Sequence, residues 1–180
     1  MLLTTSRRPC HLARVLGREL ARFLPGSEYI PRGVKTIEKI VFLAKQRGHD
    51  RVMIISSLLD KPGEIRFIEV RETWRWMDAT IRLAGVTVSR VKTKFGRLGK
   101  IRIYAEDASS LEFARWLGKI LGIDRVERTP ESGPIILITS KDGLKIKFGV
   151  MPDAEDVGPV LLVSSFGPLF KRLGDVGGSS

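Results

Sequence analysis

The chain has 180 residues, enough for one large domain or two small fused halves and too few for a multidomain machine. Hydrophobic residues make up 43% and charged residues 28% of it, a balance that excludes a disordered or fibrous chain. Lys and Arg number 31 against 20 Asp and Glu, and the net charge of +11 favours a polyanionic partner.

Membrane, secreted and metal-binding proteins are disfavoured by the sequence. No apolar run approaches the roughly 18 residues that a membrane span needs, and residues 1–8 lack the apolar stretch of a secretory signal. We therefore expect a cytoplasmic protein that binds no membrane. Cys10 is the single cysteine, and with two histidines it matches no zinc spacing, so we expect no metal, cofactor or small-molecule substrate.

The excess positive charge lies in the first part of the chain. Residues 1–104 carry 22 basic and 9 acidic side chains, whereas residues 105–180 carry 9 and 11. The densest segment has no acidic residue and contains seven cations, which are Arg82, Arg90, Lys92, Lys94, Arg97, Lys100 and Arg102. A solvated face is the ordinary interpretation of such a segment, but the mutual repulsion of these cations favours an anionic ligand.

Hydrophobic periodicity predicts alternating strands and helices in the first half. Leu12, Leu16 and Leu20 mark the apolar side of a helix that Pro25-Gly26 ends. The expected elements are a strand at 1–5, a helix at 9–24, a strand at 28–30, a helix at 36–47, and strands at 52–56, 65–70 and 74–91.

The second half shows a similar order of elements. We expect a strand at 101–105, a helix at 109–121 and a hairpin of 135–139 with 144–150 around Asp142-Gly143. A strand at 160–164 is expected to close the sheet, and residues 174–180 to form a flexible tail.

An internal repeat relates the two halves. At an offset of 101 residues, the segment 13–18 aligns without gaps with 114–119, and Leu2-Leu3 falls in register with Ile103-Tyr104. The alternative is a chance match between two amphipathic helices. The repeat predicts an α/β fold of two pseudo-repeated strand-helix-strand halves, about 1–91 and 100–173, within a single domain.

The junction between strand and helix differs in charge between the halves. The first half has Arg7 and Arg8 there, and the second has Glu106 and Asp107. Acidic residues suit the partial positive charge of a helix N-terminus, whereas two arginines are unfavourable there unless an anion binds. We therefore predict a phosphate site at Arg7 and Arg8, the alternative being that both side chains extend into water.

Further cations follow helical spacing or flank a turn. Arg14 and Arg18 lie four residues apart on one side of the first helix, and Lys35 follows the turn at Arg32-Gly33. A solvated face remains the simpler interpretation of the helical cations alone. The complete set of candidate RNA-binding residues is Arg7, Arg8, Arg14, Arg18, Arg32, Gly33, Lys35, Arg90, Lys92, Lys94, Arg97 and Lys100.

The sequence contains only weak candidates for a catalytic site. Cys10 and His11 are adjacent on a helix and point in different directions, which disfavours a nucleophile–base pair. Trp74 and Trp76 share one face of a strand. Burial in the core is the usual fate of such a pair, and a base-stacking platform is the alternative.

Several motifs together resemble the Brix domain of ribosome-biogenesis proteins. They are Thr5-Ser6-Arg7-Arg8-Pro9, Ile30-Pro31-Arg32-Gly33, the helix at 36–47, and the segment 48–55 with its sequence Gly-His-Asp-Arg-Val-Met-Ile-Ile. The resemblance implies two halves similar to the anticodon-binding domain of class IIa aminoacyl-tRNA synthetases. By motif match, it assigns RNA-facing roles to Arg7, Arg8, Arg32 and Gly33.

The function implied is that of a non-catalytic factor that binds ribosomal RNA and assists its processing and subunit assembly. Ribosomal proteins or other assembly factors are further expected partners. The chain lacks the long basic tails of eukaryotic relatives and resembles compact archaeal members. Two alternatives stay open, a freestanding tRNA-binding module and a scaffold that binds an acidic protein partner.

Overall fold

The computed structural model describes residues 1–89, 100–123, 126–127, 132–151 and 155–168. The first half contains two helices and five strands in the described part. In chain order they are β1 (Leu2–Thr5), α1 (His11–Phe23), β2 (Glu28–Tyr29), α2 (Ile37–Gln46), β3 (Arg51–Leu58), β4 (Lys61–Val70) and β5 (Trp74–Thr87). The expected elements of this half are thus confirmed, except that β5 ends at Thr87 and residues 90–91 of the expected strand lie outside the described residues.

The second half contains one helix and five strands among the described residues. They are β6 (Arg102–Ala105), α3 (Leu111–Leu121), β7 (Val126–Glu127), β8 (Gly133–Thr139), β9 (Lys145–Met151) and β10 (Glu155–Gly167). The short strand β7 is the one element that the periodicity does not predict. The expected tail at 174–180 lies outside the described residues.

Local chemistry fixes the helix ends. Cys10 caps α1, since its Sγ accepts a hydrogen bond from the backbone N–H of Ala13 at 3.3 Å. Thr36 caps α2 in the same way through the N–H of Lys39 at 3.2 Å. Helix α3 ends at Gly122, whose φ of +71° is the left-handed conformation that glycine adopts without a Cβ penalty.

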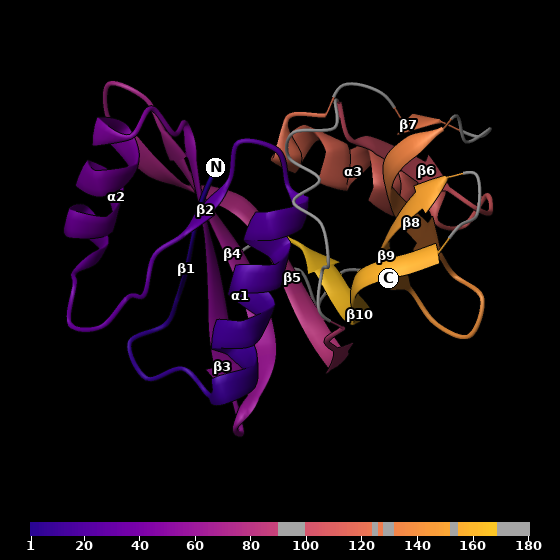
Figure 1. Cartoon of the computed structure of the whole chain (residues 1–180), viewed down its shortest axis with the longest axis horizontal. Helices are drawn as coiled ribbons and strands as arrows, with labels where there is room; N and C mark the ends of the chain where they lie inside the picture. The colour runs from indigo at the N-terminus through magenta and orange to yellow at the C-terminus, as the bar shows by residue number, and fades with distance from the viewer. Residues whose placement is uncertain (90–99, 124–125, 128–131, 152–154, 169–180) are drawn as a thin grey trace, which may run out of the picture.

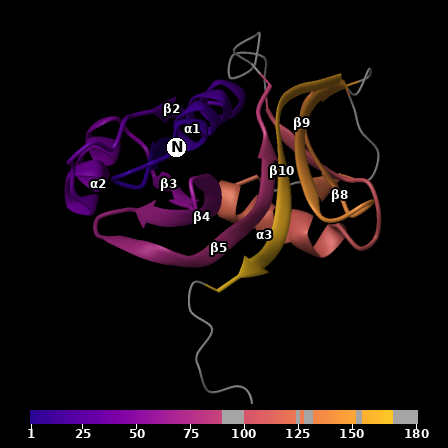
Figure 2. The same cartoon turned by 90° about the horizontal axis from the view of Figure 1, so that it is seen from below.

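All ten strands form one sheet in the order β2-β1-β3-β4-β5-β10-β9-β8-β6-β7. Each half has a parallel edge, β2-β1-β3 in the first and β7-β6-β8 in the second, followed by two antiparallel strands. The halves therefore share a topology and join through the antiparallel pair β5 and β10, which Figure 2 shows side by side.

Two sequence predictions about the sheet are wrong. The last strand does not close the sheet, because β10 lies at its centre, between β5 and β9. The strand register of the repeat is also off by one residue: Ser6 N–H bonds Ile55 O and Glu106 N–H bonds Ile138 O, so Ile103 matches Leu3 rather than Leu2. A one-residue slip exchanges the two faces of a strand.

Helices α1 and α3 cover the same face of the sheet, called here the inner face. The main core cluster takes side chains from both halves, including Leu16 of α1 and Leu117 of α3. Phe23 of α1 packs edge-on against Phe148 of β9, with 5.0 Å between ring centroids. The apolar contact between the halves is therefore continuous.

Helix α2 covers the opposite, outer face, and only over the first half (Figure 1). Its Ile40, Val41 and Ala44 bury the outer side chains of β1, β3 and β4. Residues 128–132 are all that separate β7 from β8, which leaves no room for a counterpart of α2 in the second half.

Candidate nucleic-acid interface

Three candidate arginines meet at one edge of the sheet. Strands β2, β1 and β3 run parallel and adjacent, so their carboxyl ends share an edge. Arg7 and Arg8 lie in the loop after β1, and Arg32 lies in the turn after β2. We call this edge, with residues 6–10 and 30–35, the basic edge. In open α/β sheets the carboxyl ends of parallel strands are the usual place for ligands.

The loop that carries Arg7 and Arg8 is fixed at both ends to β3. Ser6 N–H donates to Ile55 O at 2.9 Å, and Cys10 N–H donates to Ser57 Oγ at 2.9 Å. Both arginine side chains are exposed, and neither is in an ion pair or hydrogen bond with another described residue. A rigid backbone therefore presents two uncompensated guanidinium groups.

Arg32 differs from these two because it is only 6% exposed. Its Nε donates to Lys35 O at 2.6 Å, which holds the side chain within its own turn. Its Nη atoms make no hydrogen bond or ion pair with a described residue. They are also not enclosed by the protein, so the guanidinium fork opens to the surface. Buried arginines are usually paired, which makes this one unusual.

The electrostatics of the basic edge couple its residues. Burial lowers the pKa of Arg32, the nearby Arg7 charge lowers it further, and Glu38 opposes both. The pKa of Glu38 is in turn lowered, first by hydrogen bonds to its own backbone and to Thr36, then by Arg32 and Arg7. The charges of Arg7, Arg32 and Glu38 thus interact, and two cations face one carboxylate.

The remaining candidates of the first half lie close to this edge or extend along α1. Gly33 has a φ of +51°, and a Cβ there would meet no atom within 4 Å, so the turn is open. Lys35 Nζ donates to Pro31 O at 3.1 Å within the same turn. Arg14 is exposed in the first turn of α1, and Arg18, one turn further, lies over the Tyr29 ring at 5.9 Å.

The second half provides an internal comparison. Asp107 occupies the position of Arg7, and its Oδ1 accepts hydrogen bonds from Ser110 N–H at 2.8 Å and Ser140 Oγ at 2.5 Å. Its Oδ2 accepts one from Ser140 N–H at 2.8 Å. These bonds lower the pKa of Asp107, and Lys141, 2.7 Å from Glu106, lowers the pKa of that carboxylate.

This end of the second half is therefore closed by its own hydrogen bonds, whereas the basic edge is not. Helix α1 also has no acidic residue in its first turn, while α3 has Glu112. The same fold thus carries compensated charge in one half and uncompensated positive charge in the other.

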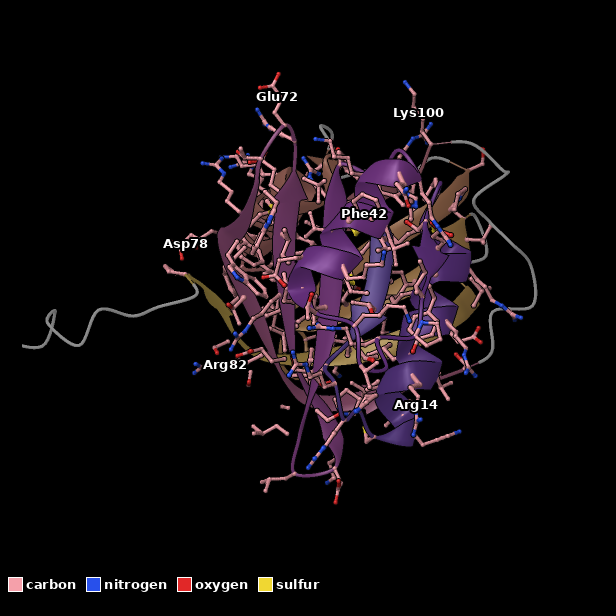
Figure 3. All side chains as sticks on the ribbon, turned by 90° about the vertical axis from the view of Figure 1, so that its left-hand side faces the viewer. Arg14, Phe42, Glu72, Asp78, Arg82 and Lys100 are labelled. Carbon is pink, nitrogen blue, oxygen red and sulfur yellow. The ribbon has the colours of Figure 1, made fainter. Side chains whose placement is uncertain are left out.

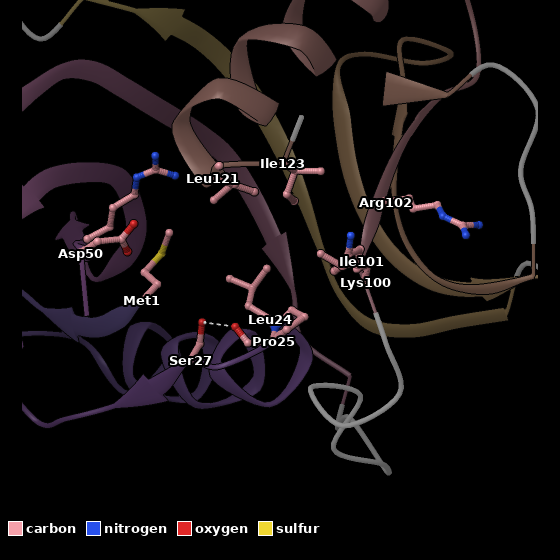
Figure 4. A pocket seen from close by; sticks show the side chains of 12 residues that line it. Met1, Leu24, Pro25, Ser27, Asp50, Lys100, Ile101, Arg102, Leu121 and Ile123 are labelled. Atoms are coloured by element: carbon pink, nitrogen blue, oxygen red, sulfur yellow. Dashed lines mark hydrogen bonds between the residues drawn. The ribbon is translucent and has the colours of Figure 1, made fainter. Parts of the chain in front are cut away.

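Lys100 does not join the basic edge. It lines a cleft of about 720 Å³ between the halves, where α1 and α3 end (Figure 4). Figure 3 shows Lys100 and Arg14 at opposite ends of the molecule. Lys100 and Arg51 line this cleft together, where the carboxyl ends of the helices carry partial negative charge. Arg90, Lys92, Lys94 and Arg97 lie outside the described residues.

Sequence reasoning missed the exposed apolar side chains beside the arginines. Val34 is 95% exposed after Gly33, and Leu58 and Leu59 are 67% and 90% exposed at the β3–β4 turn. Leu59 has a φ of +49°, an uncommon conformation for leucine. No periodicity separates these leucines from the buried strand before them, so the sequence holds no signal for their exposure.

The expectation that Trp74 and Trp76 are buried in the core is wrong. Both are 36% exposed, and neither is a member of a core cluster. They do share a strand face, as expected, and pair with Val70 and Ile68 on the outer face.

No helix in the described ranges is both long and apolar enough to cross a membrane.

Known proteins resemble the chain in sequence and in structure. No protein-family model matches the chain. A probable Brix domain-containing ribosomal biogenesis protein of Pyrococcus horikoshii is 38% identical over 91 residues, 50% of this chain and 40% of that protein. The protein of that description from Thermococcus kodakarensis is 33% identical over 125 residues, 69% of this chain and 56% of that protein. The matches thus span about half of these relatives.

Two solved structures resemble the chain over most of its length. The crystal structure of a probable ribosomal biogenesis protein from Aeropyrum pernix K1 superposes with a TM-score of 0.74 at 25% identity, covering 90% of this chain and 93% of that one. Mil, an archaeal Imp4-like protein, has the same fold, with a TM-score of 0.68 at 19% identity over 93% and 99%. In sequence and in fold the chain is thus similar to archaeal Brix domain-containing ribosomal biogenesis proteins, as its motifs predict.

Proposed function

We propose that the protein is a non-catalytic, cytoplasmic ribosome-biogenesis factor that binds pre-ribosomal RNA through the basic edge and assists its processing and the assembly of a ribosomal subunit. The observation that carries the proposal is the convergence of Arg7, Arg8 and Arg32 at one edge without a compensating ion pair among the described residues. The archaeal relatives are described as ribosomal biogenesis proteins, which supports the biological setting.

The chemistry of the edge suits phosphate groups. Guanidinium forks bind phosphate oxygens through paired N–H donors, and a pre-ordered fork loses less entropy on binding. The loop anchors at Ile55 and Ser57 and the turn around Arg32 provide this order. Recognition of this kind reads the backbone and shape of RNA rather than its sequence, because A-form grooves hide base edges from side chains.

The salt dependence of binding tests the proposal. Affinity for a structured rRNA fragment is measured over a range of salt concentrations for the wild type and for the double variant Arg7→Ala/Arg8→Ala. Each lost phosphate contact lowers the slope of log affinity against log salt by roughly 0.7 to 0.9, so the double variant should lose about 1.5. Arg32 is left unchanged because its burial ties it to folding.

The repeat supplies the matched control. Arg115→Ala/Lys119→Ala removes two exposed cations from α3, at positions that correspond to Arg14 and Arg18 in α1, and should hardly change the slope. Equal effects of the two double variants contradict a one-sided interface.

The predicted likeness of each half to an anticodon-binding domain makes tRNA the appropriate competitor. Under our proposal, an rRNA fragment displaces tRNA and not the reverse. Capture from cell extract with and without nuclease separates the remaining alternative, since a complex with an acidic protein survives nuclease digestion and an RNA-dependent complex does not.

A further inference from the structure

A second surface, on the outer face of the sheet, carries aromatic side chains that the folded chain leaves uncovered. Trp74 and Trp76 lie at the start of β5, next to the part of β4 that α2 covers. Phe42 of α2, 50% exposed, is on the same face, in front of the sheet in Figure 3. We call Phe42, Trp74 and Trp76, with the neighbouring Lys39 and Lys45, the aromatic surface.

The two indole rings are open to a ligand. No ring contact joins them to each other or to another aromatic side chain in the described ranges. Strand positions two apart are about 6.6 Å from each other, since a strand rises about 3.3 Å per residue. This spacing of strand positions is close to twice the 3.4 Å step of stacked bases, which is the separation that one base stacked between two rings requires.

Positive charge borders the aromatic side chains on the helix side. Lys39 Nζ lies 4.8 Å from the centre of the Phe42 ring, and Lys45 Nζ donates to Glu72 O of the β4–β5 hairpin at 3.2 Å. Neither lysine is in an ion pair with a described carboxylate. Aromatic rings beside unpaired cations form the usual platform for single-stranded nucleic acid, because rings stack on bases while cations attract phosphates.

We infer that the aromatic surface binds unpaired bases of RNA, with one base between Trp74 and Trp76. The inference rests on the proposed RNA-binding function and adds a contact of a different kind, since the basic edge holds phosphates and the aromatic surface holds bases. Strand β4, ten residues long, runs between the two sites, so about 30 Å separates them. A partly single-stranded RNA can reach both.

Tryptophan fluorescence tests the inference directly. The third tryptophan, Trp116, is half-buried and packs against Phe113 and Phe166. Trp116→Phe removes its emission, so that the signal comes from Trp74 and Trp76 alone. Titration with a 12-nucleotide oligoadenylate should quench this emission. Inorganic polyphosphate, which carries charge without bases, should not quench it.

Variants separate stacking from folding. Trp74→Leu/Trp76→Leu keeps apolar side chains on the strand and should weaken oligoadenylate binding roughly ten- to a hundred-fold, with duplex RNA binding and thermal midpoint nearly unchanged. Trp74→Phe/Trp76→Phe keeps rings and should retain most of the affinity. Absent quenching, or unchanged affinity of the leucine variant, overturns the inference and indicates a different occupant, such as a protein.

The two proposals fail separately. If the arginine variants flatten the salt slope while oligoadenylate gives no quenching, RNA binding at the basic edge is supported and base binding at the aromatic surface is rejected. If oligoadenylate quenches the emission while the arginine variants have no effect, the reverse holds.

Discussion

The hydrogen bonds of Asp107 predict a specific, pH-dependent loss of stability. Its carboxylate accepts three hydrogen bonds, two from Ser140 and one from Ser110. At roughly 1 kcal/mol of net stabilisation for each, Asp107→Ala should lower the free energy of unfolding by about 3 kcal/mol at pH 7. Asp107→Asn keeps one acceptor oxygen and should lose about half as much.

The pH dependence of this loss follows from the sign of the pKa shift. The hydrogen bonds lower the pKa of Asp107 below its ordinary value of 3.8. A carboxylate of this kind stabilises the fold above its unfolded-state pKa, and the contribution disappears as pH falls through the lower folded-state pKa. The wild type and Asp107→Ala should therefore differ most at neutral pH and converge as pH falls from about 5 toward 2.

Urea unfolding followed by circular dichroism at several pH values measures both effects. A loss under about 1 kcal/mol at pH 7, or a difference that does not depend on pH, refutes the conclusion that Asp107 closes its end of the second half. RNA affinity should not change in Asp107→Ala, because the proposed contacts lie in the first half.

Three further substitutions test the packing. Phe148→Ala should cost about 3 to 5 kcal/mol and leave a single unfolding transition, because the Phe23–Phe148 contact joins the halves in one core; two separate transitions in calorimetry contradict this. Gly118→Ala should cost about 1 to 3 kcal/mol despite the better helix propensity of alanine, since its Cβ would lie 2.8 Å from Ile123 O; a higher thermal midpoint contradicts it. Gly122→Ala should lower the urea midpoint through its φ of +71° and its approach to the Arg51 guanidinium; an unchanged midpoint contradicts that strain.

The elements were predictable from sequence where their signals are local. The apolar spacing of Leu16 and Leu20 with the stop at Pro25 defines α1, and Asp142-Gly143 marks the β8–β9 hairpin. The central place of β10 was not predictable, because it depends on pairing with β5 far along the chain. The strand register of the repeat failed because the strands correspond at an offset of 100 residues, whereas the helix segments 13–18 and 114–119 align at 101, and no composition signal reveals this shift.

The candidate site was predictable only in part, for a comparable reason. Arg7 and Arg32 are distant in sequence, and parallel strands bring them to one edge. Lys100 belongs to a dense run of cations in the sequence, yet it lies in the cleft beyond the other end of α1. Closeness in sequence thus predicts charge density but not a shared surface, which depends on the order of strands in the sheet.

Cross-linking of the protein to RNA by ultraviolet light in cells tests the central claim most directly. The attached RNA is sequenced and the modified peptides are identified by mass spectrometry. Our account predicts ribosomal RNA fragments attached to peptides that contain residues 6–14 and 30–35 of the basic edge. Adducts confined to the closed end of the second half, around residues 106–119, or the absence of ribosomal RNA among the fragments, contradict it.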